Sequence, residues 1–452
     1  MAKYRFIHLS DIHFGQERND GSIAIHDDIR KQLLHNCSIM RRDLGQAHGI
    51  LLTGDTVYSG KEEEFKRIAE WLEELTSVVG CQKIAVYVVP GNHDVDLDQI
   101  KRLAKLLQGK LSEGELCNLD ADLEAIFDED EHSNPMLPKF IAYRRFAEEF
   151  GCDFGSLQKP MWEKTCEMKN SNRLKFIGLN SALISDGKDK KGSLILGSKQ
   201  YVIPVENSCE FVVLVHHPIH WFRDGEKAAP YFRRARVIMV GHEHNLEIEK
   251  KTYEDGTEQL LISAGATNPP EMDGSYQYRY NWIEFDHSST GNKEELLVKV
   301  FPQLWNSSLT KFVPDTARLG GYGSREFSIA CPNFVSDVSS VPVRTTSQMT
   351  NTVCKDGEPE NRLPQEDSKM IADSEAEKFG KLRYYFWRYL DWSDRLKILV
   401  RLDLLPASLN QPVPQTLEKL ALEKARKIGK LKELWSAIME IIPEDRREEN
   451  PF

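Results

Sequence analysis

The chain has 452 residues, 40% of them hydrophobic, and a formal net charge of −11 at pH 7. This length predicts two or more folded units with sizeable cores, and the acidic charge argues against a protein that coats nucleic acid. The eight cysteines are scattered without Cys-x-x-Cys spacing, which suits reduced thiols, and no run of about 18 apolar residues could span a membrane. We therefore expect a cytoplasmic protein that does not associate with membranes.

Runs of β-type apolar residues alternate with helical periodicity over the first two thirds of the chain. Helices are predicted over 25–44 and 62–78, where apolar residues recur at three- and four-residue spacing. Strands are predicted over 5–9, 49–53, 85–90, 211–215, 236–240, 259–263, 280–285 and 295–300. This alternation is typical of an α/β fold, and the last three strands suit the second sheet of a β-sandwich.

A short polar motif directly follows each of five of these strands. The motifs are Asp11-Ile12-His13, Gly54-Asp55, Gly91-Asn92-His93-Asp94, His216-His217-Pro218 and Gly241-His242-Glu243-His244. Side chains at the ends of neighbouring strands meet at one edge of a sheet. Their imidazoles, carboxylates and one amide suit borderline divalent ions such as Mn, Fe, Zn or Co. Because two ions sharing a carboxylate can clamp both the attacking and the leaving oxygen at phosphorus, the set predicts a dinuclear site for phosphoester hydrolysis.

In this order, the five motifs resemble those of the calcineurin-like metallophosphoesterase superfamily, over about residues 3–290. The resemblance implies a β-sandwich of two mixed sheets flanked by helices. It implies two divalent metal ions bridged by Asp55, and the further ligands are Asp11, His13 and His244 for one ion and Asn92, His216 and His242 for the other. It also implies that His93 protonates the leaving oxygen or stabilises the transition state, and that Asp94 orients His93.

Two histidines near the fourth motif have open roles. His217 is adjacent to the expected ligand His216 and could support the ligands or contact substrate. His220 could lie at the substrate mouth or be solvated. Further along, Tyr276, Tyr278 and Tyr280 occupy alternate positions, which favours one packed face of a strand over a surface on which a base stacks.

The chain divides into three predicted parts. Residues 1–318 form the catalytic domain, with a helical insertion over about 96–170 that serves as a cap completing the core or as a lid over the site. Residues 328–374 are rich in Ser, Thr, Pro and Asn and indicate a flexible linker. Over 375–452 large apolar residues recur at helical spacing, which predicts a small helical bundle without a catalytic constellation.

The C-terminal bundle has a resemblance of its own. The stretch Leu417–Pro443, with its Leu-x-x-Leu pattern and Leu434-Trp435, is similar to the death-like effector-associated adaptor domains of bacterial conflict and signalling systems. The resemblance implies recruitment by a protein partner through residues 375–452. Trp435 is a candidate docking anchor if its ring is not wholly committed to the bundle core. A dimerisation module or a plain terminal bundle explains the same apolar pattern.

These observations favour a dinuclear metal-dependent phosphodiesterase that hydrolyses a nucleotide-like diester or nucleic acid. A partner would recruit the enzyme through its C-terminal helical domain. Such recruitment could belong to a bacterial signalling or defence system. A phosphomonoesterase or protein phosphatase is the alternative within the hydrolases. A signalling scaffold with a vestigial metal site is the alternative of another class, and the intact set of seven ligands counts against it.

Overall fold

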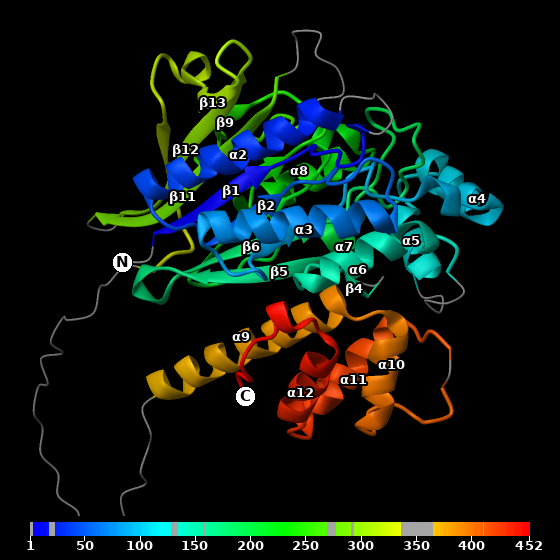
Figure 1. The fold of residues 1–452 in the computed structure, drawn as a ribbon. Coiled ribbons are helices and arrows are strands. Elements are labelled where there is room, and N and C mark those ends of the chain that lie inside the picture. Colours follow the sequence, from blue (N-terminus) through cyan, green and yellow to red (C-terminus); the bar gives the residue numbers. More distant parts are fainter. Residues whose placement is uncertain are drawn as a thin grey trace, which may run out of the picture. The chain divides into compact units, whose positions relative to one another are not determined.

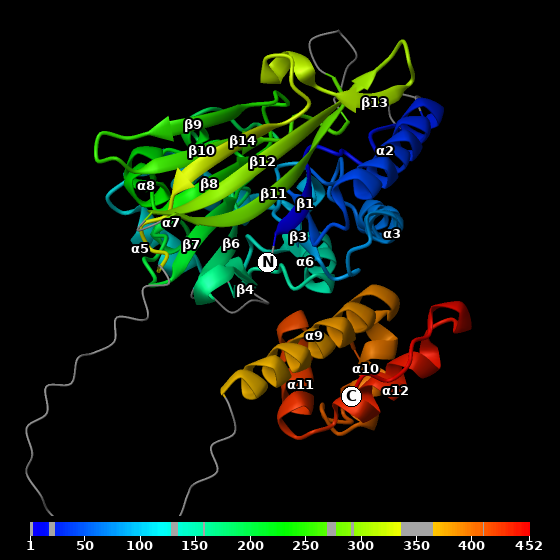
Figure 2. The same ribbon diagram turned by 90° about the vertical axis from the view of Figure 1, so that its left-hand side faces the viewer.

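The computed structural model describes residues 3–17, 23–127, 134–156, 159–268, 277–290, 293–335, 365–409 and 411–452. The chain forms two compact units, Met1–Val335 and Ser336–Phe452, drawn in Figures 1 and 2. No helix in the described ranges is both long and apolar enough to cross a membrane.

The first sheet of unit 1 carries three of the five motifs. Its strand order is β13-β12-β11-β1-β2-β3, and β14 also pairs with β12. The first three strands of the chain are parallel, whereas β11 runs antiparallel to β1. The strands are β1 (Tyr4–Leu9), β2 (Gly49–Leu52), β3 (Val86–Val88), β11 (Arg279–Thr290), β12 (Lys293–Asn306), β13 (Lys311–Pro314) and β14 (Arg325–Ala330).

The second sheet carries the other two motifs. Its order is β4-β5-β6-β7-β8-β10-β9, with β6, β7, β8 and β10 parallel and the neighbouring β5 and β9 antiparallel to them. The strands are β4 (Gly155–Ser156), β5 (Lys159–Glu167), β6 (Arg173–Leu179), β7 (Cys209–Leu214), β8 (Ala235–Val240), β9 (Ile248–Thr252) and β10 (Glu258–Ser263).

The two sheets pack face to face through aromatic side chains. Phe6 of β1 lies 5.1 Å from Phe176 of β6, and Phe176 lies 5.8 Å from Phe285 of β11, measured between ring centroids. The predicted sandwich of two mixed sheets is therefore confirmed. The prediction that β11 and β12 belong to the second sheet is wrong, because β11 pairs with β1 over Asn281–Phe285 and β12 pairs with β11.

Helices cover both outer faces of the sandwich. Helices α2 (Ile23–Leu44) and α3 (Glu62–Val79) lie over the first sheet (Figure 1). Asn36 and Cys37 of α2 contact the buried hydroxyl of Tyr280. Tyr278 and Tyr280 are buried, as one packed face requires, and Tyr276 lies outside the described residues.

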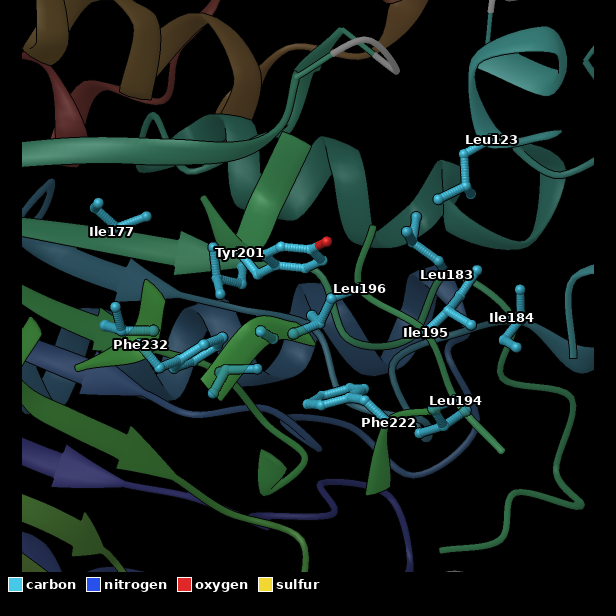
Figure 3. Packing of buried hydrophobic residues seen from close by; sticks show 14 of the residues in the cluster. Leu123, Ile177, Leu183, Ile184, Leu194, Ile195, Leu196, Tyr201, Phe222 and Phe232 are labelled. Atoms are coloured by element: carbon cyan, nitrogen blue, oxygen red, sulfur yellow. The ribbon is translucent and has the colours of Figure 1, made fainter. Parts of the chain in front are cut away.

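The predicted insertion contributes to the core over the second sheet. It contains α4 (Arg102–Glu113), α5 (Leu119–Phe127) and α6 (Ile141–Glu149), and also β4 and β5, two strands that were not predicted from the sequence. Leu123 of α5 packs in one apolar cluster with Leu183, Phe222 and Ile177 of β6 (Figure 3). The cluster also includes residues of α7 (Ser198–Tyr201) and α8 (Gly225–Phe232). The insertion thus has the packing role of a cap.

Unit 2 is a helical bundle made of α9 (Gln365–Tyr389), α10 (Trp392–Arg401), α11 (Gln415–Lys427) and α12 (Leu431–Ile441). A buried ion pair joins Arg395 of α10 to Glu418 of α11 at 3.1 Å. Trp435 is only 1% exposed, so its ring belongs to the bundle core and the docking role considered for it is wrong. Of the range predicted as a linker, 328–330 belong to β14 and 365–374 to α9, and 336–364 lie outside the described residues.

Candidate metal centre

The five motifs come together at one edge of the sandwich. Each of β1, β2, β3, β7 and β8 is separated from its motif by no more than two intervening residues, as predicted. Ligand atoms of the motif residues lie within 4.8 Å of one another in four overlapping groups. These groups are Asp11, His13 and His244; Asp11, Asp55 and His216; His13, Asp55 and His93; and His216, His217 and His242.

Asp55 occupies the middle of this cluster. Its Oδ2 lies 3.2 Å from Nε2 of His216 and 4.0 Å from Nε2 of His13, which come from different sheets. Nε2 of His244 lies 3.3 Å from Oδ1 of the neighbouring Asp11. Asp55, between His13 and His216, therefore takes the position of a carboxylate that two cations would share.

The imidazole of His216 shows that the cluster suits a cation. Nδ1 lies 2.7 Å from the carbonyl oxygen of Thr53, and because a carbonyl only accepts, Nδ1 carries the proton. The Nε2 lone pair of a neutral His216 therefore faces the Asp55 carboxylate, an arrangement that is favourable only with positive charge between them. Burial disfavours the imidazolium, but the carboxylates of Asp55 and Asp11 outweigh burial and raise the pKa of His216 to about 9.

Other buried polar atoms in the cluster lack hydrogen-bond partners. They are both ring nitrogens of His13, Oδ1 of Asn92 and Nε2 of His217. Buried polar atoms in proteins are nearly always paired, so several orphaned acceptors beside two carboxylates fit bound cations. The set of imidazoles, carboxylates and an amide oxygen suits divalent ions of the Mn, Fe, Zn or Co type.

Three motif glycines allow the loops to approach the cluster closely. A Cβ atom at Gly91 would lie 2.2 Å from Oδ1 of Asp55, and one at Gly54 would lie 2.5 Å from Nδ1 of His216. At Gly241 a Cβ would lie 2.0 Å from Oγ of Ser10. Any side chain at these positions would displace a cluster residue, so the glycines are part of the site.

The cluster residues themselves have unusual backbone conformations. The φ angles of Asp11, His13, Asp55, His242 and His244 are 50°, 45°, 49°, 69° and 57°. Such left-handed conformations cost of order 1–3 kcal/mol each and persist only where surrounding structure fixes them. Backbone hydrogen bonds supply this restraint, from the N–H of Asp11 to the Gly54 carbonyl at 3.1 Å and from that of His13 to the Asp55 carbonyl at 3.0 Å.

His93 is held by two backbone contacts. Its Nδ1 lies 2.8 Å from the carbonyl oxygen of Tyr58, which fixes the proton on Nδ1, and its backbone N–H donates to Oδ1 of Asp55 at 2.8 Å. The family resemblance implied that Asp94 orients His93, but the Tyr58 carbonyl holds the ring instead. The buried Asp94 carboxylate accepts from the N–H groups of Val57 and Gly91 and so holds the loop. Burial and the nearby Asp55 raise its pKa to about 7.

The two histidines with open roles occupy different places. His217 is buried, with Nδ1 2.8 Å from Oγ of Ser181 and its ring centroid 4.3 Å from that of His242. His220 is half exposed at the periphery, where Nε2 lies 2.9 Å from Oε1 of Glu243. Nothing in the sequence pointed to Ser181 or Glu243, because neither belongs to a motif position with a fixed residue type.

Solved structures that align with most of this chain have low sequence identity and low TM-scores. Purple acid phosphatase PPD1 from yellow lupin is 13% identical, covering 77% of this chain and 57% of that chain at a TM-score of 0.36. The 5′-nucleotidase precursor of Thermus thermophilus is 12% identical, covering 73% and 54% at a TM-score of 0.31. Similarities this weak carry no information about function.

Sequence comparison is more informative. The metallophosphoesterase-like protein YydB of Bacillus subtilis (strain 168) is 28% identical over 195 residues, which are 43% of this chain and 36% of that protein. The chain thus spans about a third of the length of this curated relative.

Two family models match the chain. The model for the GTPase-associated adaptor domain covers residues 378–440, so the expected adaptor domain is confirmed, with a GTPase-associated rather than an effector-associated model as the match. The model for calcineurin-like phosphoesterases covers residues 4–246, more than half of the chain, and includes all five motifs. The chain therefore belongs to the calcineurin-like phosphoesterase family and carries a C-terminal GTPase-associated adaptor domain.

Proposed function

We propose that the chain is a dinuclear metal-dependent phosphodiesterase that acts on a nucleotide-like diester or nucleic acid. The observation that carries this proposal is the central position of Asp55 between His13 and His216, within reach of both. In this proposal Asp55 is shared, and the remaining ligands are Asp11, His13 and His244 for one ion and Asn92, His216 and His242 for the other. When bound, the ions supply positive charge that polarises the phosphoryl group and lowers the pKa of the attacking water.

His93 would act on the leaving group. Because Nδ1 is committed to the Tyr58 carbonyl, only Nε2 can exchange a proton with substrate. A protonated His93 would donate from Nε2 to the departing oxygen and return to the neutral form. The hydrogen bond from its backbone to Asp55 keeps the ring at a fixed place beside the cluster, which limits the reorientation needed for proton transfer.

The charge beside the cluster favours a diester over a monoester. A phosphomonoester dianion needs more positive charge than a diester monoanion. Lys191 and His220, at the periphery near Trp221, both contact Oε1 of Glu243, at 2.8 and 2.9 Å. Glu243 therefore offsets the positive charge of Lys191, and a singly charged diester suits this side of the site better.

The adaptor domain supports recruitment by a protein. An adaptor domain of this family implies a protein partner. Helix α11 exposes Leu417 and Leu420 by 40% and 65%, which gives the bundle an apolar surface. We propose helix-to-helix docking of a partner, with self-association as the competing outcome. A bacterial signalling or defence role and a cytoplasmic location stay predictions from the sequence.

Substrate class is tested by direct assay. Purified protein with Mn²⁺, Zn²⁺ or Co²⁺ should hydrolyse bis(4-nitrophenyl) phosphate and at least one of a cyclic nucleotide, single-stranded DNA or double-stranded DNA. It should hydrolyse 4-nitrophenyl phosphate more slowly. A faster rate on the monoester would favour the phosphatase alternative. Absence of turnover with every metal, despite stoichiometric metal binding, would favour a scaffold.

A further inference from the structure

A cavity of about 430 Å³ lies beside the metal centre and has no role in the proposed chemistry. It is bounded by helix α8, the short turn Ile219–Trp221 and strands β8, β9 and β10. Its volume falls within the range of about 300–1,000 Å³ that is usual for small-molecule sites. Phe232, on the wall formed by α8, belongs to the apolar cluster of Figure 3, so this wall is part of a packed core.

The cavity and the metal centre share a border. Glu243, between the ligand candidates His242 and His244, lines the cavity. Its Oε1 accepts hydrogen bonds from His220 at 2.9 Å and Trp221 at 3.1 Å. The Trp221 ring lies edge-on to that of His242, with centroids 4.1 Å apart. A group bound in the cavity would thus lie close to His242, which would hold one of the two ions.

The floor of the cavity is aliphatic. Ile238 and Val240 of β8 and Leu261 of β10 line the cavity and carry no polar side-chain atom. Such a floor does not satisfy the many hydroxyl groups of a sugar chain or the charge of a second phosphate. It suits the flat face of an aromatic ring.

The side wall is a preformed aromatic surface with a polar edge. The hydroxyl of Tyr253 donates to Oε1 of Gln259 at 2.9 Å, and Nε2 of Gln259 donates to the carbonyls of Phe232 and Ala235 at 2.6 and 3.0 Å. The Arg233 guanidinium lies 4.4 Å from the Tyr253 ring centroid. These contacts hold the ring before a ligand arrives, and the charged rim residues can hydrogen-bond to the edge of a heterocycle.

We propose that this cavity binds the base of the substrate, so that the preferred diesters carry a nucleoside next to the scissile phosphate. This inference rests on the proposed phosphodiesterase function and adds the feature of the substrate that determines specificity. The base would lie on the aliphatic floor against Tyr253, and the phosphate would extend past Glu243 to the metal centre.

A variant that fills the cavity tests the proposal. Leu261→Phe places a ring in the cavity, and Thr252→Phe is the matched control because Thr252 is exposed on β9 and does not line the cavity. Saturation-transfer NMR with adenosine and thymidine, which carry no phosphate, should show binding to the wild type and to Thr252→Phe. Leu261→Phe should weaken this binding by about tenfold or more.

Kinetics separate this inference from the proposed function. Leu261→Phe should raise KM for the 4-nitrophenyl ester of thymidine 5′-monophosphate about tenfold while changing kcat little. This pattern is expected when the substrate and the transition state lose the same binding interaction. Tyr253→Leu, which removes the wall without adding volume, should act in the same direction. Turnover of bis(4-nitrophenyl) phosphate by the wild type tests the proposed function alone. Absence of nucleoside binding to the wild type, or equal binding to Leu261→Phe and Thr252→Phe, would overturn the cavity assignment.

Discussion

The backbone N–H of His93 donates a hydrogen bond to Oδ1 of Asp55 at 2.8 Å, which ties the candidate proton donor to the candidate bridging ligand. The other carboxylate oxygen of Asp55 faces His216 at 3.2 Å. The Asp55 side chain therefore fixes the position of His93 relative to the candidate metal ligands. Because only Asp55 of the two is a candidate ligand, its replacement should lower the metal content, whereas replacement of His93 should lower the rate alone.

Replacing His93 by Ala should leave both metal ions in place and lower the rate. A general acid contributes about 10²–10⁴-fold, and its loss matters less when the leaving oxygen needs no proton. The fall in kcat should therefore be large for a diester with an alkyl leaving group and small for bis(4-nitrophenyl) phosphate. Equal losses on both substrates would indicate a positioning role, and loss of metal would make His93 a ligand.

Two glycine substitutions should have opposite effects on stability. Gly91→Ala places a Cβ 2.2 Å from Oδ1 and 2.5 Å from N of Asp55, and overpacking of this kind costs about 1–3 kcal/mol. Gly109→Ala, within helix α4 with nothing inside 4 Å, should gain about 0.5–1 kcal/mol. Urea unfolding and metal analysis of both variants provide the comparison. A Gly91→Ala protein with wild-type stability and metal content would contradict the close approach.

Ion-free protein should lose stability as the pH rises. Burial opposes protonation of His216, yet Asp55 and Asp11 raise its pKa from 6.5 to about 9 in the folded state. Since the folded pKa lies above the unfolded value, the stabilisation is complete below about pH 6.5 and is lost as the pH rises through about 9. EDTA-treated protein should have a lower urea midpoint at pH 9 than at pH 6.5. His216→Gln should flatten this dependence, and an equally steep dependence in that variant would assign it to another group.

The adaptor domain should be separable from catalysis. A chain that ends at Val335 keeps β14, which pairs with β12, and Phe334, whose ring packs 4.8 Å from that of His287. It should therefore fold, retain turnover on small diesters and lose partner binding or self-association. Light scattering and pull-down with the full chain and the truncation give the comparison. A folded truncation without activity on small diesters would mean that the bundle belongs to the catalytic unit.

The sequence predicted the strands that carry motifs because each combines a buried apolar run with a polar end. It missed β5, because the charged Glu163 and Lys164 interrupt the apolar pattern between the buried Trp162 and Cys166. It also placed β11 and β12 in the wrong sheet. Antiparallel pairing of β11 with β1 joins residues more than 270 positions apart, such as His8 and Asn281, and nothing local encodes it.

At the site, the residue types were predictable from the sequence, but the groups that hold and orient them were not. His93 is oriented by the carbonyl of Tyr58, and a backbone acceptor has no sequence signal. Glu243 was visible only as the variable position between two histidines. The cavity that it borders is built from segments around residues 215–220, 229–240 and 243–261, which only the fold brings together.

Metal stoichiometry of Asp55→Asn tests the central claim most directly. Elemental analysis of the wild type should give two divalent ions per chain, and turnover should disappear on their removal and return on reloading. The Asn side chain lacks the charge that two cations share, so the variant should lose at least one ion and at least about 10²-fold in kcat. Two ions per chain and wild-type turnover in Asp55→Asn, or an active wild type without metal, would contradict the account.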